Sequence, residues 1–325
     1  MQARSVSLIL LLSLLVSVGV PLGVARGQTE VPRYSGTLIL ALREEPPSLG
    51  PQAREPTTLL VSNTLYESLV DLDANGEPTV PRLARSWSIS ADGLAYTFNL
   101  ARNVKWHDGM PFTSADVAFS LLEIQKHNTF FAPIHGQIAG VETPDPYTVV
   151  VRLKKPLYAF LMYLSGVSGT IGAKHLYEGT DILKAPANEK PVGTGPFKFV
   201  RWVRGDHVKL ERNPDYWQKG LPYLDAVVGK VIPDSRTAMV ALEKGEVSVH
   251  IHRGLSPEES KQLSKVPGIK VSEQFVDVTP NILYVLLNLR NPDDLSKPHP
   301  ILGNVKVRQA IAYAMDKKFM DEAAF

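Results

Sequence analysis

The chain has 325 residues, of which 44% are hydrophobic and 21% charged, so it is long and apolar enough to bury a substantial core. Its 35 Lys and Arg residues nearly balance its 33 Asp and Glu residues, and a formal net charge of +2 gives no electrostatic indication of a nucleic-acid or anionic-membrane partner. The sequence contains no cysteine, which excludes disulfides, thiolate metal sites, cysteine nucleophiles and a lipid-modified cysteine within these residues.

The first 27 residues have the layout of a secretory signal peptide. Arg4 precedes an uncharged, apolar run that ends near Ala25, and small residues suit cleavage after Ala25 or Gly27. A run of about 20 uncharged residues is also long enough to span a bilayer, so an uncleaved membrane anchor is the alternative. The glycines and Pro21 within the run favour cleavage. We therefore expect a signal peptide at residues 1–27 and a periplasmic protein.

The first elements after this segment form a strand, a loop and a helix. The nearly continuous apolar run at residues 37–42 predicts a buried strand. Thr57 is expected to cap a helix that carries apolar residues at helical spacing and runs out near residues 71–76. Because open α/β sheets expose ligands at the carboxyl ends of their strands, we expect a binding loop at residues 44–58.

A second region is rich in the alternating pattern of β-strands, with strands predicted at residues 86–90, 95–100 and 147–153. Between the last two, Thr113 and Asp116 resemble a capping box, which predicts a helix start.

The chain then returns to the first region. Residues 156–164 predict a short apolar helix, and residues 186–195 predict a loop. We infer a β-rich subdomain inserted at residues 80–188.

The remaining elements alternate between strand and helix patterns. Gly205 marks the turn of a hairpin, Asp234 is placed to cap a helix that Gly245 ends, and Ser256 opens a capping box. The predicted strands are 195–202, 208–212, 227–232, 247–252 and 281–288, and the predicted helices are 235–244, one following 256, and one within 305–324.

The sequence has no recognisable motif for catalysis, a dinucleotide cofactor or a metal. The turn Gly193-Thr-Gly195 is followed by a proline and a strand, which does not match a dinucleotide-binding loop. His250 and His252 would project from one strand face, but no third ligand stands at a recognisable spacing. No hydrolase or kinase signature occurs in the sequence. The sequence therefore predicts no cofactor or metal site. The absence of a catalytic motif does not exclude an enzyme, because catalytic groups can converge only in space.

The segment 96–117, read as strand, turn and helix, resembles the signature segment of the family 5 extracellular solute-binding proteins. These are the receptors that feed peptides, nickel complexes and related solutes to ABC importers. Further segments match the family in the same order along the chain. They are residues 46–49, 65–69, 83–87, 191–197, 212–217, 287–289 and 307–317.

The resemblance implies an α/β fold of the periplasmic-binding-protein type II class, a Venus flytrap of two lobes with an inserted β-rich subdomain. The first lobe would comprise residues 36–79 and 189–278, with residues 80–188 as the insert. The second lobe would begin at residues 279–325, after a hinge near 275–285. Family members are longer than this chain, so most of the second lobe, and the acidic group that holds the peptide amino terminus in peptide-binding relatives, is expected to be missing from it.

The resemblance also implies where a solute would bind. The cleft would be lined by the loop around residues 48–58, the segment after Gln125 and the turn at 193–195. The candidate ligand-binding residues are Leu49, Arg54, Thr58, Phe131, Ser165 and Thr194. In the nickel-binding branch an arginine in the segment matching 164–170 helps to hold the complex. Here that segment has no arginine, which favours peptides, with other small solutes as alternatives.

The resemblance therefore predicts the substrate-binding component of an ABC transporter, which binds its solute without turnover and is not an enzyme. It would capture a peptide or similar small solute in the periplasm and deliver it to permease subunits in the membrane. We expect it to act as a monomer and not to bind nucleic acid. Two alternatives are a secreted hydrolase on the same scaffold and a membrane-tethered sensor domain.

Overall fold

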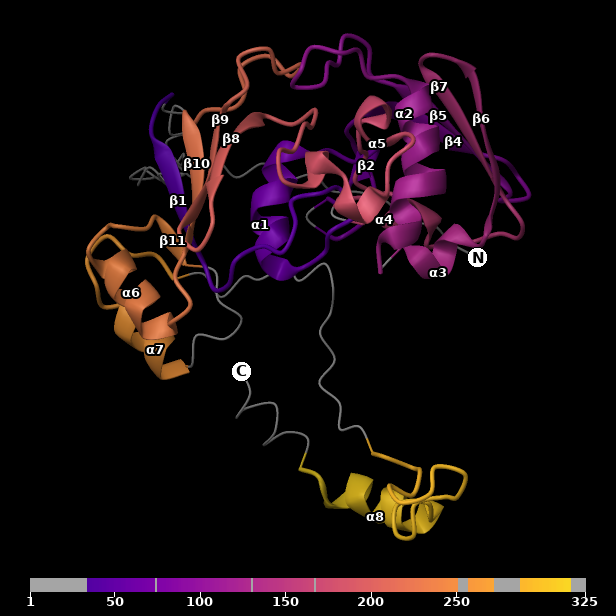
Figure 1. Ribbon diagram of the computed structural model, residues 1–325, viewed down its shortest axis with the longest axis vertical. Coiled ribbons are helices and arrows are strands. Elements are labelled where there is room, and N and C mark those ends of the chain that lie inside the picture. The colour runs from indigo at the N-terminus through magenta and orange to yellow at the C-terminus, as the bar shows by residue number, and fades with distance from the viewer. Residues whose placement is uncertain are drawn as a thin grey trace, which may run out of the picture. The chain divides into compact units, whose positions relative to one another are not determined.

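The fold is taken from a computed structural model that describes residues 34–73, 75–129, 131–166, 168–250, 257–271 and 287–316 (Figure 1). The predicted signal peptide and the predicted hinge near 275–285 lie outside these residues. Within the described ranges, no helix is long and apolar enough to cross a membrane.

A five-stranded mixed sheet joins segments that are far apart in the sequence (Figure 1). Its order is β11 (Val249–His250), β1 (Thr37–Leu42), β10 (Ala226–Val231), β9 (His207–Arg212) and β8 (Phe197–Val203). β1 is parallel to both of its neighbours, whereas β9 and β8 continue the sheet in antiparallel pairs. The prediction of a strand at residues 37–42 is confirmed with the same bounds.

Helix α1 (Pro56–Leu65) follows β1, and it differs from the predicted helix at both ends. It starts one residue before the predicted cap Thr57, because the fixed φ of proline suits the first helical position. It stops at Leu65, since the backbone is already extended at Tyr66. The prediction that the helix runs to about residue 71 is therefore wrong.

After α1 the chain forms a small two-stranded sheet of β2 (Val70–Asp71) and β3 (Val80–Pro81). Ser68 and Val70 also make isolated bridges to Thr170 and Ser165, respectively. These bridges explain why the apolar residues beyond Leu65 do not extend the helix.

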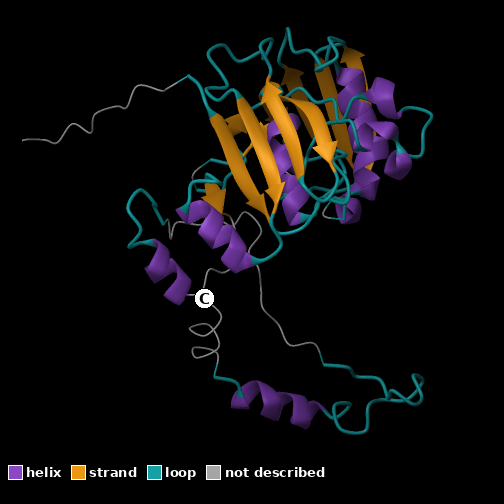
Figure 2. Ribbon diagram, turned by 60° about the vertical axis from the view of Figure 1, so that its left-hand side comes forward, coloured by secondary structure: helices purple, strands orange, loops and turns teal. Residues whose placement is uncertain are grey.

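A second, antiparallel sheet has the order β4 (Ala84–Ile89), β5 (Ala95–Leu100), β7 (Thr148–Leu153) and β6 (Ile138–Asp145), and both sheets are visible in Figure 2. Alternate residues of β5 are buried, as the sequence pattern predicted. The strands predicted at 86–90, 95–100 and 147–153 are confirmed, with boundary shifts of at most two residues.

Helix α2 (Ser114–Phe119) begins at the predicted position. The backbone N–H of Thr113 donates to Asp116 Oδ2 over 2.8 Å, which is one half of the expected capping box. The helical path continues through a π-helical turn at Ser120–Ile124 and a 3-10 turn at Gln125–His127.

Short helices complete this region. They are α3 (Ala132–His135), α4 (Phe160–Tyr163) and α5 (Lys174–Tyr177), with 3-10 turns at Ile182–Lys184 and Pro186–Asn188. The helix predicted at 156–164 is therefore limited to α4, because the chain before it forms a turn in which Phe160 N–H donates to Leu157 O.

Helix α6 (Ser235–Glu243) lies between β10 and β11 in the sequence, and helices α7 (Pro257–Leu263) and α8 (Val305–Ala314) follow β11. Asp234 caps α6 as predicted, since its Oδ1 accepts from Thr237 N–H at 2.8 Å. The predicted helix at 305–324 begins at the expected residue and ends at Ala314, with residues beyond 316 outside the described part. The predicted strand at 281–288 lies mostly outside it as well.

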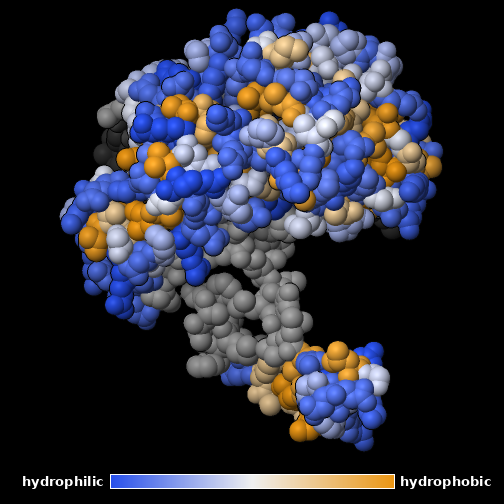
Figure 3. Space-filling view, viewed as in Figure 1, coloured by the Kyte–Doolittle hydropathy of each residue, from blue (hydrophilic) through white to orange (hydrophobic). Residues whose placement is uncertain are grey.

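Each large sheet contributes to its own hydrophobic core. The core beside the five-stranded sheet contains Leu40, Leu42, Leu49, Val61, Leu65, Tyr66, Phe197, Val208, Leu210 and Val227. The core beside the four-stranded sheet includes Phe98, Trp106, Phe112, Val117, Leu121, Phe131, Val149 and Phe160. On the face shown in Figure 3, hydrophobic residues form separate patches among hydrophilic ones, consistent with apolar side chains gathered inside.

The turn Gly193-Thr-Gly195 lies directly against the end of α1. Gly195 N–H donates to Leu65 O at 2.9 Å. A Cβ at Gly193 would lie 1.8 Å from the same oxygen, and a Cβ at Gly195 would lie 2.6 Å from it. Both positions therefore require glycine for close backbone approach.

We predict that Gly193→Ala lowers the free energy of unfolding by about 2 kcal/mol or more, because the added methyl group overpacks against backbone. Urea denaturation of the variant and the parent protein measures the difference. Gly136→Ala is the matched control, since a Cβ there meets nothing within 4 Å. Equal stability of Gly193→Ala and the parent would contradict the packing described.

Candidate functional site

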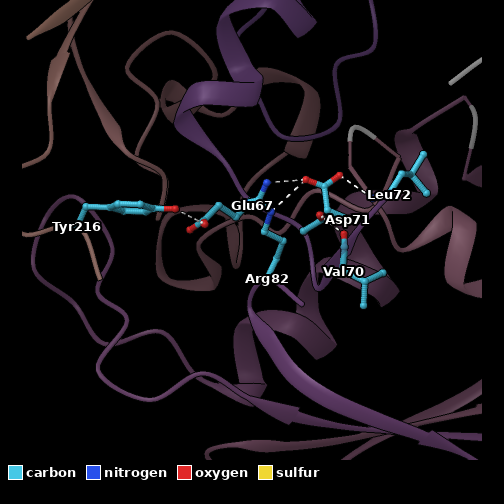
Figure 4. Close-up of polar contacts among 7 residues, drawn as sticks. Glu67, Val70, Asp71, Leu72, Arg82 and Tyr216 are labelled. Atoms are coloured by element: carbon cyan, nitrogen blue, oxygen red, sulfur yellow. Dashed lines mark hydrogen bonds and ion pairs between the residues drawn. The ribbon is translucent and has the colours of Figure 1, made fainter. Parts of the chain in front are cut away.

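Glu67, two residues after the end of α1, connects three segments of the chain. Its Oε2 accepts hydrogen bonds from Thr194 Oγ1 at 2.9 Å and from Trp217 Nε1 at 3.0 Å. Its Oε1 accepts from the Tyr216 hydroxyl at 2.8 Å, a contact drawn in Figure 4. One carboxylate therefore fixes the predicted cleft turn to the end of α1 and to the segment that carries Tyr216 and Trp217.

Opposing effects act on the pKa of the Glu67 carboxyl group. Burial raises the pKa of its carboxyl group, and the hydrogen bonds from Trp217, Tyr216 and Thr194 and the charge of Arg82 oppose that rise. Arg82 is itself held by Asp71, with Nη2 2.8 Å and Nε 3.0 Å from Asp71 Oδ2 (Figure 4). Burial also raises the pKa of the Tyr216 hydroxyl, so it stays a donor to Glu67.

His107 also binds the turn at 193–195. Gly193 N–H donates to His107 Nδ1 at 3.1 Å, and His107 Nε2 lies 2.9 Å from Gly195 O. Since Nδ1 accepts, the ring proton sits on Nε2 and the imidazole is neutral. Burial is the main cause that lowers the pKa of His107 to about 4. His107 N–H also donates to Gly193 O at 2.9 Å.

The predicted binding loop packs through buried polar contacts. Thr58 Oγ1 donates to Ser48 O at 2.9 Å, and Leu49 N–H donates to Asn188 O at 2.9 Å. The guanidinium of Arg54 donates to Ala53 O from Nη1. Burial lowers the pKa of Arg54 to about 9, against the opposing charge of Glu55.

A network of buried amides connects this loop to the segment after Gln125. Arg54 Nη2 donates to Thr170 Oγ1 at 3.4 Å, and Gln125 Nε2 donates to Thr170 O. Asn128 Nδ2 in turn donates to Gln125 Oε1 at 2.6 Å and to Ser168 O at 3.0 Å. The structure thus brings Arg54 together with a segment more than 70 residues away in the sequence.

The six predicted ligand-binding residues are all buried. Leu49 and Phe131 belong to the two different hydrophobic cores. Ser165 Oγ donates to Met162 O at 2.6 Å, and Thr194 bonds to Glu67. The structure links Arg54 to Thr170 rather than to another predicted site residue. Contact with a solute stays a prediction for all six.

Sequence reasoning did not single out Glu67, His107 or Gln125. Two of them lie in segments that resemble the family: Glu67 lies in residues 65–69, and His107 lies in residues 96–117. Gln125 was named only as the residue before a predicted cleft segment, with no role of its own. Its role follows only from the fold.

Among the residues that the structure describes, no group of three or more His, Asp and Glu side chains could hold a metal ion. His252, one of the two histidines considered as ligands, lies outside that part of the chain.

A family model for bacterial extracellular solute-binding proteins, family 5, matches residues 78–325. The chain therefore belongs to this family. It is 34% identical over 260 residues to a putative ABC transporter peptide-binding protein of Brucella ovis, covering 78% of this chain and 46% of the relative. It is 31% identical over 290 residues to the glutathione-binding protein GsiB of Pectobacterium atrosepticum, covering 86% of this chain and 51% of that protein.

Solved structures of solute-binding proteins are also similar to this chain. The DppA protein of Helicobacter pylori in complex with peptide STSA has a TM-score of 0.64 at 32% identity, covering 73% of this chain and 50% of that one. NikZ of Campylobacter jejuni in complex with Ni(L-His) has a TM-score of 0.69 at 27% identity, covering 87% of this chain and 54% of that one. The predicted type II periplasmic-binding-protein fold class is confirmed. The chain spans about half the length of these relatives.

We predict that the pKa of His107 makes the protein less stable in acid. The folded pKa of about 4 lies below the usual value of 6.5, so the unfolded chain binds more protons between these pH values. The free energy of unfolding should therefore rise as the pH increases from about 4 to 6.5. His107 should contribute up to about 3 kcal/mol to this rise. Urea unfolding across this range measures it.

His107→Gln should flatten this rise, whereas His127→Gln, at a partly exposed position, should leave it in place. A His107→Gln protein whose pH profile runs parallel to that of the parent would show that His107 is not the responsible group.

We also predict that Glu67→Gln lowers the free energy of unfolding by about 1–3 kcal/mol. An amide has one acceptor oxygen for three donors, and its NH2 group must face one of them. Glu178→Gln is the control, because its exposed pair with Lys174 should contribute less than about 1 kcal/mol. Equal effects of the two substitutions in urea denaturation would refute a special role for Glu67.

Proposed function

We propose that the protein is the solute-binding component of an ABC importer and that it captures a peptide or a similar small solute. The observation that carries this proposal is the family match over residues 78–325, together with relatives described as peptide-binding and glutathione-binding proteins. The structural neighbour from Helicobacter pylori, which is in complex with a peptide, supports the same substrate class.

The proposal includes a place of action and a partner. The expected signal peptide at residues 1–27 would direct the protein to the periplasm, where it would act as a monomer. It would then hand its solute to the permease subunits in the membrane. Membership of a family of extracellular solute-binding proteins supports this arrangement.

We further propose the predicted lobe organisation. Residues 36–79 and 189–278 would form the first lobe, residues 80–188 the insert, and residues 279–325 the start of the second lobe. The composition of the sheets supports it: the five-stranded sheet takes its strands from residues 37–42 and from 197 onward, whereas the four-stranded sheet lies between 84 and 153.

The proposed solute wall consists of the loop at 48–58, the segment after Gln125 and the turn at 193–195. Leu49, Arg54, Thr58, Phe131, Ser165 and Thr194 are the candidate contacts. The network from Arg54 through Thr170 to Gln125 supports a single wall, because it ties two of these segments together. Such ties keep binding groups in place before the solute arrives, which lowers the entropy lost on binding.

We predict that the protein retains tripeptides from a random mixture and returns them unchanged. Retained peptides would be released by denaturation and identified by mass spectrometry, with thermally unfolded protein as the control. A binding protein holds its ligand without turnover, so the released masses should equal the supplied ones. Cleaved products would instead indicate a secreted hydrolase, and no retention at all would contradict a peptide solute.

A further inference from the structure

Asn75 is the one asparagine of the sequence that is followed by glycine. It is exposed, in the connection between β2 and β3. Its backbone N–H donates to Asp73 Oδ1 at 2.8 Å, but within the part of the chain that the structure describes its side-chain amide makes no hydrogen bond. Asparagine is among the thermally labile residues of proteins. The side-chain carbonyl carbon of Asn75 is therefore accessible to a nucleophile.

The backbone nitrogen of Gly76 is the neighbouring nucleophile. Gly76 has a φ of +82°, in the left-handed region that favours glycine, and a Cβ there would meet nothing within 4 Å. No side chain of its own hinders the approach of its nitrogen to the Asn75 amide. The hydrogen bond from Gly76 N–H to Asp73 O, at 3.0 Å, opposes this approach. Such a bond contributes only about 1 kcal/mol net, because water replaces it when it breaks.

Asp73 determines the shape of this turn. Besides the Asn75 N–H, its Oδ1 accepts from Glu77 N–H at 3.0 Å, and its Oδ2 accepts from the Thr79 hydroxyl at 2.9 Å. The hydrogen bonds from Glu77, Asn75 and Thr79 lower the pKa of the Asp73 carboxyl group, so it is ionised at neutral pH. One carboxylate thus binds the backbone on both sides of the peptide bond between Asn75 and Gly76.

We propose that Asn75 is a site of spontaneous deamidation in the folded protein. The Gly76 nitrogen loses its proton to base and attacks the side-chain carbonyl carbon of Asn75, which closes a succinimide ring. The bond to the side-chain nitrogen breaks, and this nitrogen takes up a proton and leaves as ammonia. Water then adds to one of the two ring carbonyl groups and opens the ring to aspartate or isoaspartate. Overall one water is consumed and one ammonia is released, and no oxidant or reductant takes part.

The products change the charge and the backbone of the turn. Either product carries a carboxylate, which lowers the formal net charge of the chain from its present +2 by one charge. In isoaspartate the main chain runs through the side chain and gains one methylene group, so Asp73 Oδ1 can no longer bind the N–H groups of residues 75 and 77 in the same geometry. The hairpin affected is the one closed by Asp71 and Arg82, whose ion pair measures 2.8 Å (Figure 4). Deamidation here would occur whichever solute the protein binds.

The alternative is that Asp73 protects Asn75 as long as the protein is folded. Attack on the side-chain carbonyl carbon requires a rotation of the backbone at Asn75, and the hydrogen bonds of Asp73 resist this rotation. If they prevent it, only the unfolded chain reacts. A comparison of the folded protein with the protein in urea therefore separates the two possibilities.

The experiment incubates the parent protein and Asn75→Gln in mildly alkaline and mildly acidic buffer well below the melting temperature, and the parent also in urea. Isoelectric focusing detects the acidic product, and peptide mapping by mass spectrometry locates the residue whose amino group has been replaced by a hydroxyl group. Asn103 is the internal control, because it is exposed, has a φ of 63° and precedes the β-branched Val104. Asp92 and Asp108 also precede glycine, but their isomerisation leaves the mass unchanged.

The folded parent should deamidate at Asn75 about tenfold or more faster than at Asn103, because the side chain of Val104 hinders its own nitrogen. The rate should rise with pH, since the attacking nitrogen must first lose its proton, and Asn75→Gln should stay free of the acidic product over the same time. Equal rates at Asn75 and Asn103 in the folded parent would overturn the proposed site. Reaction at Asn75 in urea without reaction in the folded protein would overturn it as well, and would assign Asp73 the protective role.

Discussion

The candidate site depends on the close approach of the turn Gly193-Thr-Gly195 to the last carbonyl oxygens of α1. No side chain fits at Gly193, so the two backbones meet directly. His107 binds the turn through three hydrogen bonds, and Glu67 binds Thr194. This junction connects the strand-turn-helix segment at 96–117 to the five-stranded sheet, and it fixes one end of the proposed solute wall.

The local elements were predictable wherever a short sequence pattern decided them. The strand at 37–42, the helix start at Thr113 and the cap at Asp234 depend on neighbouring residues, and all three were found where expected. The end of α1 was not predictable in this way. It depends on contacts that Ser68 and Val70 make with a segment about 100 residues away, and such contacts leave no local pattern.

The candidate site was also predictable only in part from the sequence. The loop, the segment after Gln125 and the Gly-Thr-Gly turn were expected to meet because the sequence resembles a known family. The network that joins Arg54, Thr170 and Gln125 could not be derived, because it needs the register of segments that are distant in the sequence. The hydrogen bonds of the Arg54 guanidinium to Ala53 O and Thr170 Oγ1 are likewise visible only in the fold.

We propose that the protein binds its solute reversibly and does not transform it. Titration calorimetry with the solute that the protein carries when isolated from its native host tests this most directly. Reversible binding should give a saturable heat with a stoichiometry near one, a return to baseline after each injection, and recovery of the solute unchanged. A heat flow that continues after each injection, or a chemically altered solute, would contradict it.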